Sequence, residues 1–230
     1  MADIEKFQKQ VHVTFVDKRL LEAAFTHRSY LNENKTSGRE HNERLEFLGD
    51  AVLELVVTEF LFKKYPRKAE GELTSVRAAL VNTNSISACA TELGMNEHLL
   101  LSKGEAADVG RARQYILANV FEAFVGALYL DQGYNVARDF ISTHLLHKTE
   151  AIVAGSLWQD AKSLFQEKAQ EHAGVTPTYK TIREVGPDHA KRFTVGVYIS
   201  KELIFKGEGL SKQEAETAAA RGALKKQGWG

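Results

Sequence analysis

Apolar residues recur at three- and four-residue spacings through most of the first 150 residues, and this period predicts helices. The stretches that keep it are residues 45–65, 71–93, 115–130 and 135–151. The first of them stops at Pro66, which cannot continue a helix, and the second has Thr74 or Ser75 available as an N-cap. Residues 115–130 would present apolar side chains on almost every face of a helix, so they predict a helix buried at the centre of the domain.

The pattern changes beyond residue 160. Residues 161–172 still have a helical period, but three segments that follow read as β-strands, and residues 211–226 return to helix. The predicted strands are Thr178–Val185, Arg192–Ile199 and Glu202–Gly209. Two helices around three strands predict a small α+β domain, with both helices on one face of an antiparallel sheet.

The break in the helical pattern at Gly155 and Ser156 indicates the domain boundary. We therefore predict an all-α domain at residues 1–150, a linker at 151–159 and the α+β domain at 160–230. Lys plus Arg and Asp plus Glu both total 30, but residues 156–230 hold 12 basic and 9 acidic residues. A basic C-terminal part behind an acidic N-terminal part is a weak sign of a nucleic-acid-binding domain joined to a carboxylate-rich site.

The cysteine content and the hydropathy of the chain indicate in which cellular compartment the protein works. Cys89 is the only cysteine, so the chain can form no internal disulfide, which fits a reducing compartment. The first ten residues are charged where a signal peptide needs an apolar run. No stretch approaches the roughly 20 apolar residues of a membrane span. These features predict a cytoplasmic protein that makes no use of a membrane.

Three carboxylates stand on one face of a predicted helix. Glu43, Glu46 and Asp50 are separated by three and four residues, a spacing that places side chains together and makes like charges repel. A solvated acidic face and a cation-binding site both fit this spacing. A second segment favours the cation, because Glu122 lies among apolar residues, where an unpaired carboxylate is costly. Asn119 projects on the same side, and such oxygen donors suit Mg²⁺ or Mn²⁺.

Residues 42–51 (NERLEFLGDA) closely resemble the signature of the ribonuclease III family. The resemblance continues through residues 25–30 (FTHRSY), 70–81 (EGELTSVRAALV) and 118–131 (ANVFEAFVGALYLD), and then covers the C-terminal domain. It implies an all-helical, dimerising endonuclease domain followed by a double-stranded-RNA-binding domain.

The same resemblance assigns roles to the candidate residues. It implies that Glu46, Asp50 and Glu122 are catalytic and bind the metal ion. Further members of the site follow from the same motifs: Asn119 as a metal ligand, Glu43 and Glu70 in the cleavage valley, and Phe47 as an aromatic that enters a socket on the partner subunit.

Asn119 departs from the commoner pattern, in which Asp precedes the essential Glu by three residues. An amide oxygen can hold Mg²⁺ or orient a water, but it adds no negative charge. A natural variant, an engineered inactivating change and a degenerate site are all open explanations. We favour the natural variant, because every other carboxylate is intact.

The C-terminal domain resembles a double-stranded-RNA-binding domain, which contacts an A-form duplex through three regions. Polar side chains on one helix face suit the shallow minor groove, a loop supplies a second groove contact, and the start of the last helix can hold phosphates. The residues in these regions are Ser163, Gln166, Glu167 and Gln170, then Pro187 and His189, then Ser211 and Lys212.

The resulting hypothesis is a metal-dependent endoribonuclease that cuts both strands of double-stranded RNA as a homodimer. The resemblance implies products with 5′-phosphate and 3′-hydroxyl ends and short 3′ overhangs, from ribosomal and messenger RNA precursors. The alternative is a protein that binds duplex RNA without cutting it, and only Asn119 favours that reading.

Overall fold

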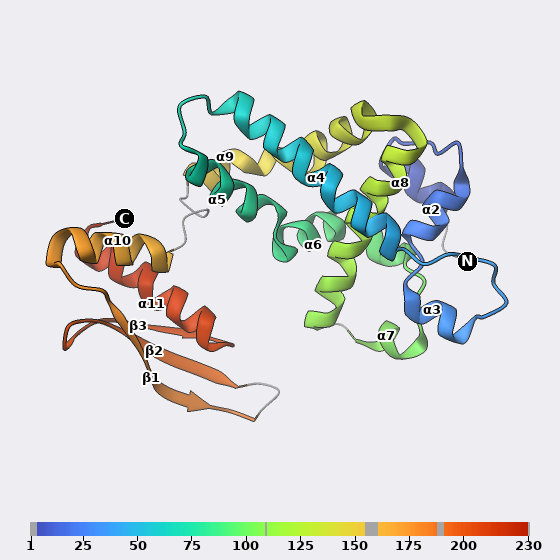
Figure 1. Cartoon of the computed structure of the whole chain (residues 1–230). Coiled ribbons are helices and arrows are strands. Elements are labelled where there is room, and N and C mark those ends of the chain that lie inside the picture. The colour runs from blue at the N-terminus through green and yellow to red at the C-terminus, as the bar shows by residue number, and fades with distance from the viewer. Residues whose placement is uncertain (1–3, 109, 155–160, 188–190, 230) are drawn as a thin grey trace. The chain divides into compact units, whose positions relative to one another are not determined.

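The computed structural model describes residues 4–108, 110–154, 161–187 and 191–229. The chain divides into two compact units, Met1–Trp158 and Gln159–Gly230 (Figure 1). Within the predicted linker, residues 151–154 belong to a helix that packs against the first unit, and residues 155–159 lie outside the described ones. No helix in the described part of the chain is both long and apolar enough to cross a bilayer.

The first unit is helical, which confirms the predicted fold class. Its α-helices are α1 (Ile4–Gln10), α2 (Lys18–Ala24), α3 (Arg28–Glu33), α4 (Glu43–Lys64), α5 (Glu70–Val81), α6 (Thr83–Glu92), α7 (Lys103–Ala107), α8 (Arg111–His144) and α9 (Thr149–Ala154). Two 3₁₀ helices, Met95–His98 and Leu146–Lys148, complete it. The most extensive packing joins α4 to α8 (Figure 1).

The core of this unit surrounds α8, as the apolar pattern of residues 115–130 predicts. Phe121 and Phe124 are fully buried, and the ring of Phe124 packs edge-on against Phe7, with 5.4 Å between centroids. Edge-to-face aromatic pairs add about 1 kcal/mol to the burial of their area. The result is a rigid helix on which the polar side chains of α8 are held in place.

The prediction of one continuous helix over residues 71–93 was wrong. Asn82 has an extended backbone and separates α5 from α6, and its side-chain oxygen accepts a hydrogen bond from the backbone N–H of Ser85 at 2.9 Å. The proposed N-caps were also wrong. Thr74 and Ser75 lie inside α5, and Glu72 instead accepts a hydrogen bond from the backbone N–H of Ala69. A local cap ends a helix without disturbing the hydrophobic period, so the period alone does not reveal the break.

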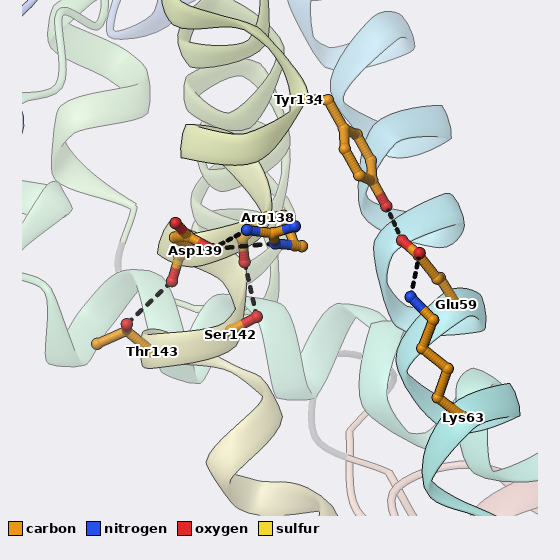
Figure 2. A network of polar contacts seen from close by, with 7 residues as sticks. All are labelled: Glu59, Lys63, Tyr134, Arg138, Asp139, Ser142 and Thr143. Atoms are coloured by element: carbon orange, nitrogen blue, oxygen red, sulfur yellow. Dashed lines mark hydrogen bonds and ion pairs between the residues drawn. The ribbon is translucent and has the colours of Figure 1, made fainter.

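Helix α8 is longer than predicted and contains a kink at Gly133, whose backbone is non-helical (φ 81°). Just past the kink, the hydroxyl of Tyr134 donates to Glu59 of α4, which also pairs with Lys63 (Figure 2). Burial and this hydrogen bond raise the pKa of Tyr134 to about 12. The contact ties the second half of α8 to α4. The helix ends at His144, so the helix predicted over 135–151 is interrupted before α9.

The second unit consists of α10 (Ala161–Ala173), β1 (Thr178–Val185), β2 (Arg192–Ile199), β3 (Glu202–Gly209) and α11 (Lys212–Gln227). All three predicted strands are confirmed, in an antiparallel sheet of order β1-β2-β3. Both helices cover the same face of this sheet (Figure 1). Phe165 of α10, Val197 of β2 and Leu224 of α11 share a buried core, so the predicted α+β architecture is confirmed.

Candidate active site and nucleic-acid interface

Hydrogen bonds hold the start of α4, the helix that carries Glu43, Glu46 and Asp50, in place. Asn42, only 1% exposed, donates its backbone N–H to the carbonyl of Thr26 at 3.0 Å and its side-chain amide to the carbonyl of Ala24 at 3.3 Å. Buried polar groups are kept only when hydrogen-bonded in this way. The end of α4 that carries the acidic residues is therefore held against the loop that follows α2.

Two glycines allow α4 and α8 to cross in direct backbone contact. A Cβ on Gly49 would lie 1.7 Å from the carbonyl oxygen of Glu122, and one on Gly126 would lie 2.2 Å from the carbonyl oxygen of Leu45. No other residue type fits at either position without moving a helix, because real Cβ atoms are almost never closer than 3.0 Å to such atoms. This crossing brings the Glu46–Asp50 turn of α4 beside Glu122 of α8.

The carboxylates at the crossing are close enough for their charges to interact. Burial, followed by the negative charges of Asp50 and Glu46, raises the pKa of Glu122 to about 7. Burial and the charges of Glu43 and Asp50 also raise the pKa of Glu46. Desolvation and like charges both favour the neutral carboxyl, so a nearby cation would relieve a real electrostatic cost.

Asn119 belongs to the same group, because its side chain forms a hydrogen bond with Glu46 that opposes the rise in the Glu46 pKa. In the described part of the chain, no three or more Asp, Glu, His or Cys side chains are arranged as a group that could hold a metal ion. The donor chemistry nevertheless fits one: three carboxylates and an amide are hard oxygen ligands of the kind that Mg²⁺ and Mn²⁺ prefer.

The remaining candidates in this unit lie around the group. Glu43 is exposed and faces two basic side chains, Arg28 at 3.6 Å and His41 at 3.7 Å. Glu70 begins α5 and accepts a hydrogen bond from Thr74 at 2.9 Å. It does not contribute to the pKa shifts of Glu46 or Glu122, so the structure does not bring it into the coupled group.

Phe47 projects into solvent, with 82% of its surface exposed. It lines a cavity of about 1050 Å³ whose walls also include Leu20, Leu48 and Leu130, with Arg39 and Arg44 among its polar lining. A large aromatic that is exposed beside apolar cavity walls marks a candidate interaction surface.

In the second unit, the first group of RNA-contact candidates shares one face of α10. Ser163, Gln166, Glu167 and Gln170 are exposed and line a shallow cavity of about 420 Å³. The polar lining of this surface suits contacts to 2′-hydroxyls.

The structure describes only part of the other two groups of RNA-contact candidates, the loop after β1 and the start of α11. Ser211 caps α11, accepting a hydrogen bond from the N–H of Glu214, and Lys212 pairs with Glu184 at 3.0 Å. A phosphate at this helix end would therefore compete with Glu184 for Lys212. Pro187 is exposed after β1, and His189 lies outside the described residues.

Comparison with known proteins agrees with this arrangement. The family described as Ribonuclease-III-like matches residues 17–149, and the double-stranded RNA binding motif matches residues 161–227. Proteins named Ribonuclease 3 from Nitratiruptor sp. and Bacillus licheniformis are 43% and 46% identical to the chain. The alignments cover 98% and 96% of this chain and 97% and 89% of theirs.

A solved structure of the nuclease domain of ribonuclease III from Campylobacter jejuni is also similar. It is 41% identical, with a TM-score of 0.56 over 62% of this chain and 98% of that one, and it is described as containing a region involved in dimer formation. A helical nuclease domain followed by a duplex-RNA-binding motif defines a class of endoribonucleases. The chain belongs to the ribonuclease III family, which depends on a divalent metal ion.

Sequence reasoning missed the residues that build the site without touching substrate. Gly49 and Gly126 set the helix crossing, and Asn42 anchors the start of α4. A signal was present, since a glycine in an otherwise apolar helix lowers helix stability by about 1 kcal/mol and so indicates a packing role.

Proposed function

We propose that this endoribonuclease hydrolyses the phosphodiester bonds of double-stranded RNA at the carboxylates of α4 and α8. The products would have 5′-phosphate and 3′-hydroxyl ends and short 3′ overhangs. The observation that carries the proposal is the helix crossing at Gly49 and Gly126. It buries Glu122 beside Asp50 and Glu46, and this burial, followed by the two negative charges, raises the pKa of Glu122 to about 7.

The residues that would hold the metal ion are Glu46, Asp50 and Glu122, with the amide oxygen of Asn119. We infer Mg²⁺ as the metal, with Mn²⁺ as a substitute, because all four donors are oxygens. Such an ion, when bound, lowers the pKa of a water and stabilises the leaving oxygen. Glu122 must lose its proton to act as a ligand, and its pKa of about 7 without a metal ion means that metal binding competes with a proton. Glu43 and Glu70 would line the cleavage valley farther out.

The active form we propose is a homodimer in which each subunit cuts one strand. The support is Phe47, which is 82% exposed beside a partly apolar cavity, together with the dimer-forming region described for the Campylobacter jejuni domain. A Phe side chain that leaves water gains about 2 kcal/mol, which favours its insertion into a second copy.

The second unit would bind the duplex. The α10 face, Pro187, His189, and the start of α11 at Ser211 and Lys212 would contact two minor grooves and the phosphates between them. Ribosomal and messenger RNA precursors are the substrates we propose, and the cytoplasm is the compartment. The buried thiol of Cys89, whose pKa burial raises to about 12, is unreactive and consistent with that location.

Asn119 supports one other function, a protein that binds duplex RNA without cutting it. A radiolabelled RNA duplex incubated with and without Mg²⁺ separates the two. We expect cleavage that depends on Mg²⁺, and binding without cleavage at any Mg²⁺ concentration would favour the alternative.

Two variants then test the site itself. Asp50→Ala and Glu122→Ala should abolish cleavage, while duplex affinity stays within a few-fold because a separate unit binds the RNA. Glu97→Ala, which removes an exposed carboxylate in the 3₁₀ helix Met95–His98, is the control and should cut at the parent rate. If either site variant also cut at the parent rate in Mg²⁺, the assignment of the active site would be wrong.

A further inference from the structure

Among the described residues of the second unit, both helices lie on one face of the sheet, and neither covers the other face (Figure 1). Val197 and Ile204 point into the core beneath α10 and α11, so Gly196 and Tyr198, the neighbours of Val197 in β2, point away from it. The strand register places Lys180 of β1 and Lys206 of β3 on either side of Gly196. We call this uncovered side the outer sheet face, and its residues include Lys180, Ile182, Arg183, Arg192, Thr194, Tyr198, Leu203, Lys206 and Glu208.

The centre of the outer sheet face holds one aromatic ring, that of Tyr198. A Cβ on Gly196 would meet the side chains of Ile182, Tyr198 and Leu203 within 3.0 Å, so these three side chains close over the glycine. Tyr198 is only half-buried, and the ammonium of Lys180 lies 5.4 Å from the centre of its ring. The ammonium lies over the ring, so a nucleobase that stacks on Tyr198 would take its place and leave Lys180 free to meet a flanking phosphate.

The charge of the outer sheet face is positive and unopposed. Four cations, Lys180, Arg183, Arg192 and Lys206, share it with one acidic residue, Glu208. Within the described parts of the chain, none of the four forms an ion pair, since the ion pairs of this unit involve other residues.

The helix-covered side behaves differently. Three of its lysines are neutralised, in the pairs Lys162–Glu216, Lys168–Glu171 and Lys212–Glu184, at 2.6, 2.7 and 3.0 Å. The outer sheet face therefore leaves a larger share of its cations available for a polyanion than the helix-covered side does.

We propose that the outer sheet face binds single-stranded RNA, with one base stacked on Tyr198 and the flanking phosphates near Lys180 and Lys206. The proposal rests on the proposed function and adds to it, because a duplex substrate cut from a longer transcript carries single-stranded flanks. The face lies on the opposite side of the sheet from α10 and α11, which carry two of the three regions that we propose contact the duplex. Charge alone would also suit an acidic protein, but the half-buried ring of Tyr198 on the central strand favours a base.

Binding of two RNA probes to the full chain tests the proposal. With EDTA present to prevent cleavage, fluorescence anisotropy measures the affinity for a labelled 12-nucleotide single strand and for a labelled 20-base-pair duplex. Tyr198→Leu keeps an apolar cover over Gly196 but removes the aromatic ring. We expect it to weaken single-strand binding by roughly tenfold, the usual cost of losing one stacked base, and to leave duplex binding within twofold.

A charge variant provides a second readout that does not depend on the packing at Gly196. Lys206→Gln should lower the slope of log affinity against log salt for the single strand by about 0.7, the contribution of one neutralised phosphate. Lys225→Gln, which removes an exposed cation from the last turn of α11, is the matched control and should leave that slope unchanged.

Unchanged single-strand affinity in Tyr198→Leu together with an unchanged slope in Lys206→Gln would overturn the proposal. So would a polyglutamate peptide that binds the parent and loses affinity in both variants while the single strand binds all forms equally, since the face would then be a protein-docking surface. Duplex cleavage in Mg²⁺ is measured in parallel. Its absence from the parent would count against the proposed function alone, because single-strand binding is measured without metal.

Discussion

Replacing Gly49 by alanine tests the helix crossing on which the active site depends. The added Cβ would lie 1.7 Å from the carbonyl oxygen of Glu122 and 2.9 Å from the backbone nitrogen of Gly126. Because such an atom is almost never found within 3.0 Å of another residue's heavy atom, α4 and α8 must separate by at least 1.3 Å. Backbone atoms cannot rotate away as a side-chain tip can, so the whole crossing has to move.

The expected effects follow from that displacement. Overpacking a buried contact costs about 1–3 kcal/mol, and the better helix propensity of alanine returns at most about 1 kcal/mol. At about 2–4 °C per kcal/mol, the melting temperature of the nuclease unit should fall by about 5 °C. Cleavage should fall roughly a hundredfold, since catalytic groups displaced by about 1 Å lose that much rate.

Calorimetry and single-turnover cleavage of one duplex measure both effects. Gly104→Ala is the control, because Gly104 lies in α7 and a Cβ there meets nothing within 4 Å. It should be neutral or slightly stabilising and should cut at the parent rate. If Gly49→Ala melted within 1 °C of the parent and cut equally fast, the two helices could not be in backbone contact, and our explanation of the active site would be refuted.

Three further predictions concern the same unit. The pKa of Glu122 is raised from 4.5 to about 7, so between these pH values the folded, metal-free protein retains a proton that the unfolded chain has lost. The free energy of unfolding should therefore fall by on the order of 2 kcal/mol as the pH rises from 4.5 to 7. Urea unfolding of Glu122→Gln should show that this dependence is lost. Asn119→Asp should lower the Mg²⁺ concentration for half-maximal cleavage, since charged oxygens bind hard cations more tightly; identical titration curves would remove residue 119 from the metal site. Phe47→Ala should weaken the proposed dimer, seen by sedimentation as monomer at micromolar concentration, whereas a dimer as tight as the parent would show that Phe47 is not at the interface.

Some of the site can be read from the sequence because it depends on local geometry. Carboxylates three and four residues apart on a helix must share a face, so Glu43, Glu46 and Asp50 could be grouped before any fold was known. The strands of the second unit were also predicted with their correct bounds, because their pattern of apolar and turn residues fixes both the element and its ends. The family resemblance then implied the two-domain architecture that the structure and the comparisons confirm.

Other features depend on contacts between residues far apart in the chain. The approach of Glu122 to Asp50 and Glu46 follows from where α4 and α8 cross, and no spacing within one helix specifies that point. The helix break at Asn82 was missed because a side-chain cap leaves the hydrophobic period intact. The sequence by itself therefore determined which side chains share a face or a strand. Only the tertiary structure decided which faces meet, because α4 and α8 come into backbone contact at two glycines, where any side chain would clash with the facing helix.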